Sequence, residues 1–210
     1  MEQILWLYAL DYDPDYPVIC FDERPCFLIE DVKTPIAMRS GKVSKQHYAY
    51  KKNGSCCLLA AIEPRTGKRI AKVYDRRTKT EYAEFMDFVV QHYPNAVQLR
   101  IVQDNLNTHN PSSFYENFSA QKAFALTRKL EFYYTPLSAS WLNMIEIEFS
   151  ALARQCLNQR IPSKQLLEKK VLTLVKERSD KKIKINWQFS LDNAREKMER
   201  HYKKVNPSIL

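Results

Sequence analysis

The chain alternates between short apolar runs and stretches with helical spacing, and this order constrains its fold more than any other feature. Five segments are typical of β-strands: 18–21, 55–62, 69–74, 97–102 and 131–134. Helical patterns follow the third, fourth and fifth of them, over 80–93, over 114–129 and from residue 140 onward. Three successive strands predict an antiparallel meander, and strands that return after helices predict parallel neighbours. We therefore expect an α/β fold with a mixed five-stranded sheet flanked by helices.

Two parts of the chain fall outside this alternation. Residues 24–53 show no clean periodicity and contain two prolines and a glycine, so we interpret them as a basic insertion after the first strand. Beyond residue 160 the pattern predicts two more helices, one from about Ser163 and one from a Ser190 cap. The expected organisation is a core over residues 1–160 and a basic helical extension over 161–210. Thr80, which precedes Glu81, is the predicted cap of the helix after the third strand.

The basic charge lies in particular segments. Of 210 residues, 33 are Lys or Arg and 24 are Asp or Glu, which gives a formal net charge of +9. Residues 1–150 contain 18 of each sign, so the whole excess lies in 151–210, and within the first part residues 33–52 hold six basic side chains and no acid. Aromatic residues lie among these bases, which favours a nucleic-acid partner over a merely solvated face.

Composition excludes several classes of protein. Hydrophobic residues make up 45% of the chain, which excludes a disordered or fibrous protein. Only three glycines are present, and no P-loop or GxGxxG motif occurs. The five cysteines form no CxxC pair or zinc-type spacing, which favours reduced core thiols and an intracellular location. The apolar runs are too short to span a membrane, so we expect a cytoplasmic protein with no membrane partner.

Acidic residues occur where three of the predicted elements meet. Asp22 ends the first strand, Asp104 follows the fourth, and Glu146 and Glu148 lie in the helix after the fifth. Carboxylates at the ends of neighbouring strands can share a divalent cation, and a third carboxylate allows two ions to flank one phosphodiester. Residues two apart on a helix point about 200° apart, so at most one glutamate faces the ions, and geometry does not choose between them. Glu23 is the corresponding alternative to Asp22, since adjacent strand residues face opposite sides.

Three strings around these acids resemble a known family. They are VICFDE at 18–23, IVQDNLNTHN at 101–110 and SASWLNMIEIEFSAL at 138–152, and INWQFSLDNAREKMERHY at 185–202 resembles the same family's C-terminal signature. The family is that of bacterial insertion-sequence transposases related to the mariner elements (insertion sequence 630 family), in the DDE superfamily of endonucleases. The resemblance implies an RNase H-like core that cleaves transposon ends and joins their 3′ hydroxyls to target DNA.

The resemblance also implies roles for particular residues. Asp22, Asp104 and Glu146 match the three acids and would be ligands of Mg²⁺ or Mn²⁺, with two ions expected; the Leu-Asn-x-Ile-Glu motif favours Glu146 over Glu148. Four polar residues are expected to support the site. Asn105 and Asn107 would orient the metal ligands, touch phosphate or order the loop, and His109 would contact the DNA backbone or a metal-bound water. Asn143 would set the entry of the helix after the fifth strand. The candidates for DNA contacts are Lys42, Lys45, Lys51, Lys52, Arg76, Arg77, Lys181, Lys182 and Lys184.

The sequence departs from the family at its N-terminal end. About sixteen residues precede the first strand, too few for the helix-turn-helix region that reads transposon ends in relatives. The chain is therefore expected to be a truncated copy, the second half of a split reading frame, or a core that depends on a separately encoded helix-turn-helix partner. A homodimer is expected because two DNA ends must be joined. The alternative function is a catalytically inactive DNA-binding remnant of a decayed element, and a further one is an RNase H-type or repair nuclease.

Overall fold

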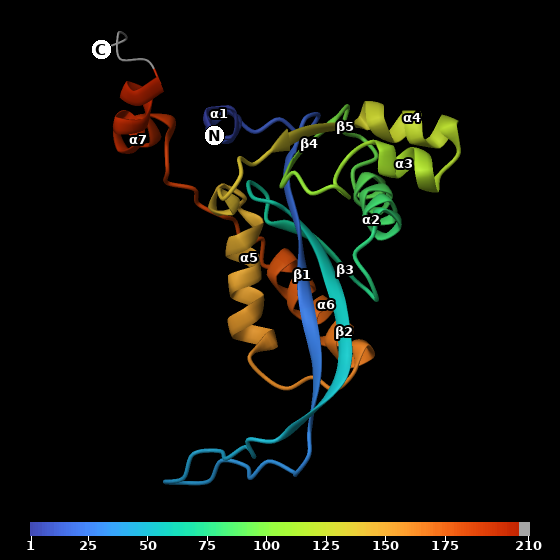
Figure 1. Cartoon of the computed structure of the whole chain (residues 1–210), viewed down its shortest axis with the longest axis vertical. Helices are drawn as coiled ribbons and strands as arrows, with labels where there is room; N and C mark the ends of the chain where they lie inside the picture. Colours follow the sequence, from blue (N-terminus) through green and yellow to red (C-terminus); the bar gives the residue numbers. More distant parts are fainter. Residues whose placement is uncertain (206–210) are drawn as a thin grey trace.

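A single five-stranded sheet organises the computed structural model, which describes residues 1–205 (Figure 1). Its strands are β1 (Val18–Asp31), β2 (Tyr50–Glu63), β3 (Lys68–Tyr74), β4 (Leu99–Gln103) and β5 (Leu130–Tyr134). The helices are α1 (Glu2–Ala9), α2 (Lys79–Gln91), α3 (Ser112–Asn117), α4 (Ala120–Lys129), α5 (Ile145–Leu152), α6 (Lys164–Asp180) and α7 (Leu191–Val205). Within the described range, no helix is long and apolar enough to cross a membrane.

The strands follow the order β3-β2-β1-β4-β5. Strand β2 pairs antiparallel with both β1 and β3, whereas β4 pairs parallel with both β1 and β5. This arrangement confirms the predicted meander and the mixed sheet, and it makes the first and fourth strands neighbours in the middle of the sheet.

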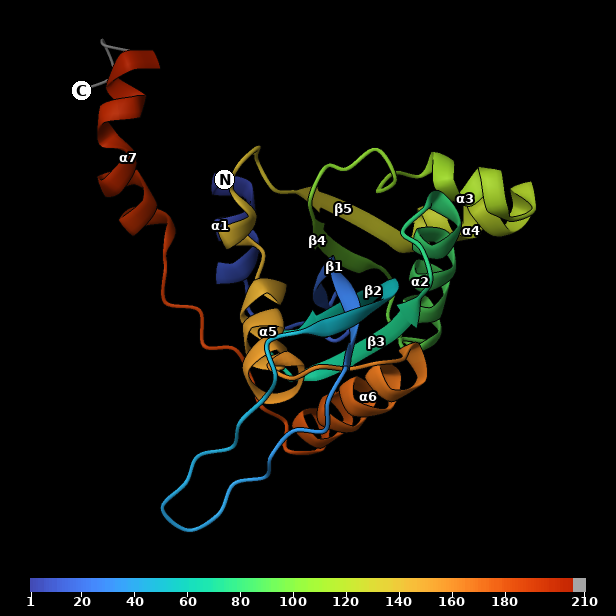
Figure 2. The same cartoon turned by 60° about the horizontal axis from the view of Figure 1, so that its bottom comes forward.

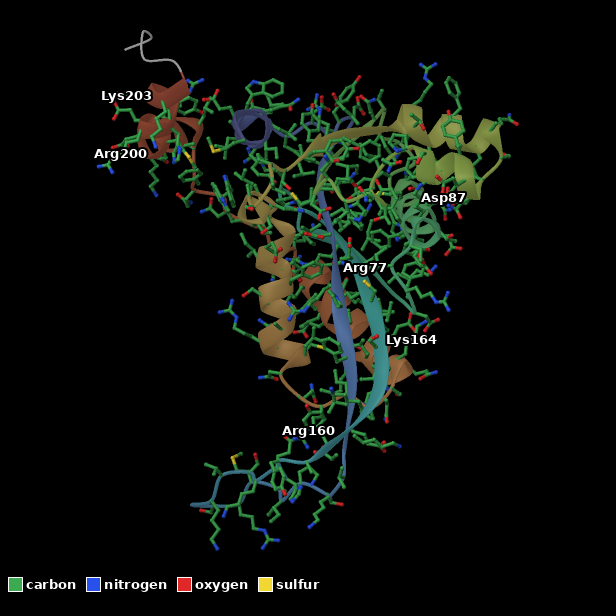
Figure 3. All side chains as sticks on the ribbon, in the orientation of Figure 1. Arg77, Asp87, Arg160, Lys164, Arg200 and Lys203 are labelled. Carbon is green, nitrogen blue, oxygen red and sulfur yellow. The ribbon has the colours of Figure 1, made fainter. Side chains whose placement is uncertain are left out.

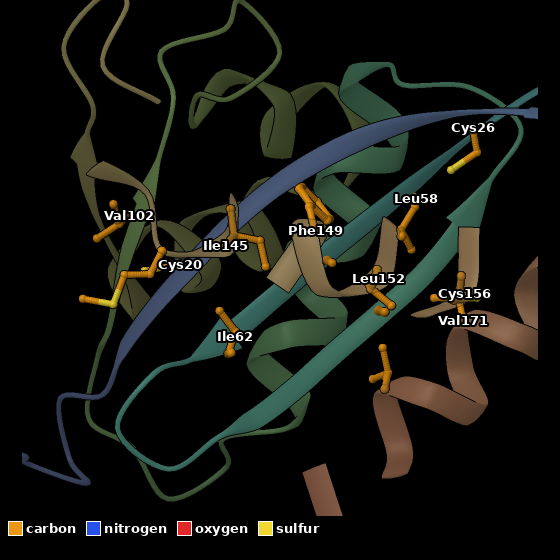
Figure 4. Packing of buried hydrophobic residues seen from close by; sticks show 14 of the residues in the cluster. Cys20, Cys26, Leu58, Ile62, Val102, Ile145, Phe149, Leu152, Cys156 and Val171 are labelled. Carbon is orange, nitrogen blue, oxygen red and sulfur yellow. The ribbon is translucent and has the colours of Figure 1, made fainter. Parts of the chain in front are cut away.

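Alternate residues of the strands face two separate apolar layers. On β1, Ile19 and Phe21 belong to a cluster that includes buried residues of α2, α3 and α4. Cys20 belongs instead to the cluster that includes buried residues of α1, α5 and α6, part of which is drawn in Figure 4. Because the strand period is two, side chains at even positions of β1 therefore point toward α5.

The first strand does not end at Asp22 as the sequence pattern predicted. Strand β1 continues to Asp31 and pairs with β2 as far as Tyr50, so only the middle of the expected insertion lies outside the ladder. Strand β4 pairs with β1 only through Cys20, so Pro25 lies where β1 has become an edge strand, a position that tolerates proline. The intervening residues 32–49, called the arm below, project away from the sheet (Figure 2).

Three helix predictions were wrong in detail. The cap of α2 is Thr78 rather than Thr80, because Glu81 closes a capping box with Thr78. The single helix expected over 114–129 is split into α3 and α4, since the Ser119 hydroxyl accepts a hydrogen bond from Lys122 N and begins a new helix. The helix expected from Ser140 starts as a 3₁₀ turn over Ser140–Leu142, and α5 begins after an extended Asn143. Helix α1, which buries Ile4, Leu5, Leu7 and Tyr8, was not predicted.

The C-terminal helices begin where the sequence predicted. Ser163 caps α6, and the Ser190 hydroxyl accepts from Asn193 N at the start of α7. Leu167, Val171 and Val175 of α6 lie in the same apolar cluster as α5 and the sheet. The division at residue 160 stays a prediction, although α6 shares its core with the sheet.

Candidate active site

Asp22 and Asp104 lie side by side on neighbouring parallel strands. In the β1–β4 pair, Val18 is opposite Arg100 and Cys20 is opposite Val102. Two further residues along each chain bring Asp22 and Asp104 to the same level, where β4 has just ended. Asp22 is at an even position of β1, on the side that faces α5. The neighbouring strands and their register therefore place two of the three predicted acids together.

The two glutamates of α5 have different surroundings. Asn143, which precedes the helix, is buried and donates through Nδ2 to the Phe21 carbonyl at 2.8 Å, so α5 starts beside Asp22. Glu148 is 2% exposed, and both of its oxygens contact arginines. Glu146 is exposed, as expected for a residue on the opposite side of the helix. Asn143 thus fixes the start of the helix, the ordering role expected for it.

The acids repel one another. Burial raises the pKa of Asp22 to about 7; a hydrogen bond from Glu23 N opposes this shift, and the charges of Asp104, Glu23 and Glu146 add to it. Glu146 is therefore close enough to Asp22 for their charges to interact. A cation between these carboxylates would relieve the repulsion.

The donor chemistry of the site fits a hard divalent cation. Asp22 accepts a hydrogen bond at Oδ1 from Glu23 N (2.8 Å), and Asp104 Oδ1 lies 2.5 Å from His109 Nδ1. For both aspartates, every side-chain hydrogen bond within the described residues is at Oδ1. Carboxylate oxygens are the ligands that Mg²⁺ and Mn²⁺ prefer. Among residues 1–205 no three His, Cys, Asp or Glu side chains lie close enough to form a ready ligand set, so the acids are near one another but not at coordination distance.

The buried His109 side chain contacts the second acid, Asp104. It is 2% exposed, and its Nε2 lies 2.8 Å from Glu23 Oε2 while its Nδ1 contacts Asp104. Burial opposes the charged imidazole, but hydrogen bonds to Asp104 and Glu23 outweigh it and raise the pKa of His109 to about 9. The ring also stacks on Tyr82, with centroids 4.9 Å apart. Because the ring is buried and both nitrogens contact carboxylates, His109 reaches the site through Asp104 and Glu23. Its contact with the DNA backbone or with a metal-bound water stays a prediction.

Glu23 therefore has a role that the sequence reasoning considered only as an alternative to Asp22. Its side chain faces the opposite side of β1 and contacts both His109 and Arg77 (Nη1–Oε1, 3.3 Å). Two adjacent acids in the first motif were the sequence signal for this second role, because successive residues of a strand face opposite sides of the sheet.

The loop after Asp104 forms a shallow pocket with the end of the sheet. Glu23, Arg77 and residues 105–108 line it, and Asn105 and Asn107 are exposed there. The loop is ordered by other side chains: Asp104 accepts from Leu106 N at 3.4 Å, and Asn110 donates to the Asn107 carbonyl at 2.6 Å. The side chains of Asn105 and Asn107 therefore face solvent at the candidate site.

The predicted DNA-contact residues are all exposed but fall into three separate groups. Lys42, Lys45, Lys51 and Lys52 lie on the arm and the adjoining end of β2, and Arg76 and Arg77 lie between β3 and α2. Figure 3 shows Arg160 at the base of the arm and Arg77 farther along the sheet. Lys181, Lys182 and Lys184 follow α6 and lie near the β2–β3 turn, where the Ile183 carbonyl approaches Gly67. Of the three groups, only Arg77 contacts an acid of the motifs, and that acid is Glu23, on the side of β1 opposite Asp22.

Comparisons with known proteins agree with this architecture. Residues 17–168 match the family model described as DDE superfamily endonuclease. The Mos1 mariner transposase, solved as a paired end complex with Mn, has a similar structure, with a TM-score of 0.59 at 13% identity over 98% of this chain. The chain spans 59% of the Mos1 chain. This similarity confirms the predicted RNase H-like fold.

Two viral structures are also similar. A chain of the simian T-cell lymphotropic virus intasome, in complex with PP2A regulatory subunit B56 gamma, matches with a TM-score of 0.46 and 13% identity, over 75% of this chain and 47% of that one. The HTLV-2 integrase catalytic core domain, in complex with magnesium in its dimeric form, matches with a TM-score of 0.40 and 15% identity, over 79% of this chain and 88% of that one. No curated protein matches the sequence significantly.

Proposed function

Because this chain belongs to the DDE superfamily endonucleases, we propose that it is the catalytic domain of a DNA transposase of the insertion-sequence type, related to the insertion sequence 630 family. Its reactions would be metal-dependent hydrolysis at transposon ends and transfer of the freed 3′ hydroxyl to a target strand. The observation that carries the proposal is the placement of Asp22 and Asp104 at one level of two parallel strands, beside the helix that presents Glu146.

Asp22, Asp104 and Glu146 would hold one or two divalent cations, Mg²⁺ or Mn²⁺. Bound there, such ions would activate the attacking oxygen and stabilise the leaving oxygen of a phosphodiester. His109, whose ring contacts Asp104 at 2.5 Å and Glu23 at 2.8 Å, keeps the Asp104 carboxylate oriented. Arg77, Asn105 and Asn107, which line a pocket with Glu23 at the loop after Asp104, would contact the phosphate backbone.

The substrate would be duplex DNA, and two copies of the chain would act together because a transposon has two ends. Mos1, whose structure is a paired end complex, supports this proposal through its similar fold. A separately encoded helix-turn-helix protein would supply recognition of the end sequence, and the protein would work in the bacterial cytoplasm at the nucleoid. The nine exposed basic residues of the three groups would bind phosphate without reading sequence.

Nicking of supercoiled plasmid tests the proposal. We expect wild-type protein to nick the plasmid with Mg²⁺ or Mn²⁺ and to stop when EDTA is added. Asp22→Asn and Asp104→Asn should lose nicking by at least 100-fold while their DNA affinity stays within about twofold, since base and phosphate contacts lie elsewhere. Binding without nicking by the wild-type protein would overturn the enzyme proposal in favour of a DNA-binding remnant. A preference for an RNA–DNA hybrid would favour the RNase H-type alternative.

A further inference from the structure

A buried ion triad links α5 to two other elements. Glu148 of α5 is contacted by Arg178 of α6 through Nε–Oε1 (2.9 Å) and Nη2–Oε2 (3.1 Å), and by Arg69 of β3 through Nε–Oε2 (2.9 Å). The side chains of Arg69 and Glu148 are 1% and 2% exposed, and that of Arg178 is 13% exposed. A carboxylate that meets a bidentate arginine has a fixed direction as well as a neutralised charge.

Arg69 extends the triad to the backbone. Its Nη1 donates to the Gly67 carbonyl (2.6 Å) and its Nη2 to the Ile183 carbonyl (2.8 Å). The triad therefore joins the β2–β3 turn, β3, α5, α6 and the segment after α6 at one point. Helix α5, which continues as a π-helix over Ala153–Leu157, has its polar contacts at this point and at Asn143.

Fixing Glu148 also fixes Glu146. The two residues are separated by about 200° around the helix axis, so when Glu148 points toward β3 and α6, Glu146 points away from them. Asn143 sets where the helix starts, next to Phe21 and Asp22, but one hydrogen bond does not set how the helix is rotated. Glu148 is the charged residue of α5 that is held from both sides. It therefore constrains the rotation together with the apolar residues Ile145, Phe149 and Leu152, which pack into the core.

Stability alone does not account for such a triad. Replacing a buried ion group by well-packed apolar residues is often neutral or stabilising, because the charges must be removed from water. What the ion group adds over apolar packing is a fixed direction for each of its charged side chains.

We propose that Glu148, Arg69 and Arg178 are positioning residues that set the rotation of α5 and thereby direct the Glu146 carboxylate toward Asp22. This inference rests on the proposed function, because it gives a reason for the direction of Glu146. It also makes α6 part of the catalytic unit, although α6 lies beyond the core expected from the sequence.

Substitution of Arg178 tests the proposal. The variants are Arg178→Met, which removes the bidentate partner, Arg178→Lys, which keeps the charge, and the control Arg100→Met. Arg100 is a partly buried strand arginine with a carboxylate partner, Glu131 (3.6 Å), at the start of β4. Mn²⁺ bound to metal-free protein is measured by electron paramagnetic resonance, nicking is measured against Mn²⁺ concentration, and thermal unfolding checks the fold.

We expect Arg178→Met to raise the half-saturating Mn²⁺ concentration about 10- to 100-fold in both assays, the usual effect of losing a residue that orients a metal ligand. Arg178→Lys should fall between this variant and the wild type, and Arg100→Met should match the wild type. The sign of the change in Mn²⁺ affinity distinguishes the two effects. Removing a positive charge near the acids would by itself strengthen Mn²⁺ binding, so weaker binding indicates that the Glu146 carboxylate is misdirected.

An unchanged or lower half-saturating concentration in folded Arg178→Met would overturn the inference and leave the proposed function standing. If Arg178→Met does not fold, wild-type Mn²⁺ dependence of Arg178→Lys would overturn it instead. If the wild-type protein binds Mn²⁺ but never nicks DNA, the proposed function fails while the binding comparison still decides the positioning role. If the wild-type protein binds no Mn²⁺, both fail together.

Discussion

The His109 imidazole shows how single residues support this site. One nitrogen of the buried ring contacts Asp104 and the other contacts Glu23. Because its two nitrogens contact carboxylates on opposite sides of the ring, the imidazole holds Asp104 in one direction. The residue therefore acts through Asp104, as a positioning residue.

The raised pKa of His109 predicts how stability depends on pH in metal-free protein. The folded-state pKa of about 9 exceeds the ordinary 6.5, so the stabilisation is complete below pH 6.5 and is lost as the pH rises through 9. Urea unfolding in EDTA should show the free energy of unfolding falling by on the order of 3 kcal/mol over this range, relative to His109→Gln. Parallel curves for the two proteins would show that His109 is not charged in the folded state.

At the scale of elements, strand and helix identity followed from the sequence but their ends did not. The apolar runs predicted all five strands, because burial imposes a period of two or a continuous apolar core. Pro25 and the acids at 22–23 suggested an early end of β1, and only the pairing with β2 shows that the strand continues. The sequence did not decide between Glu146 and Glu148 or predict the contacts of His109 for the same reason. The side chains that contact Glu148 and His109 come from residues distant in sequence.

The start of α2 gives a direct test of such a boundary. Thr78→Ala should lower the free energy of unfolding by about 1 kcal/mol, because the Thr78 side chain accepts from Thr80 N and forms a capping box with Glu81. Thr80→Ala is the matched control: its hydroxyl bonds Asn117 at the surface (2.7 Å), and the expected loss is below about 0.5 kcal/mol. Chemical denaturation measures both. A larger loss for Thr80→Ala than for Thr78→Ala would show that Thr80 caps the helix, as the sequence pattern predicted.

At the scale of the whole molecule, charge is segregated rather than spread. Asp22, Asp104 and Glu146 lie near one another, while the nine candidate DNA-contact residues form three groups on the arm, beside the site and after α6. Because α6 contributes to the core, deleting the chain from residue 161 would remove packing as well as charge. Point substitutions are therefore the appropriate test of which group binds DNA.

The group after α6 is expected to bind phosphates. Replacing Lys181, Lys182 and Lys184 together by glutamine should make the dependence of log Kd on log salt concentration less steep by about 0.9 for each lost phosphate contact. Fluorescence anisotropy with a labelled duplex at several salt concentrations measures this slope. Lys122→Gln with Arg128→Gln, on α4, is the control and should keep the wild-type slope. An unchanged slope in the triple variant would remove these lysines from the DNA interface.

In the DNA complex, Asp22, Asp104 and Glu146 are expected to converge on divalent metal. Mapping the protein backbone with Fe²⁺ tests it most directly, because Fe²⁺ in the metal site generates hydroxyl radicals from peroxide and ascorbate that cut the nearest peptide segments. We predict cuts near residues 22, 104 and 146, competed by Mg²⁺ and lost together in Glu146→Gln. Cuts that lie elsewhere, or cuts near residue 148 that persist in Glu146→Gln, would show that these three acids do not share a metal site.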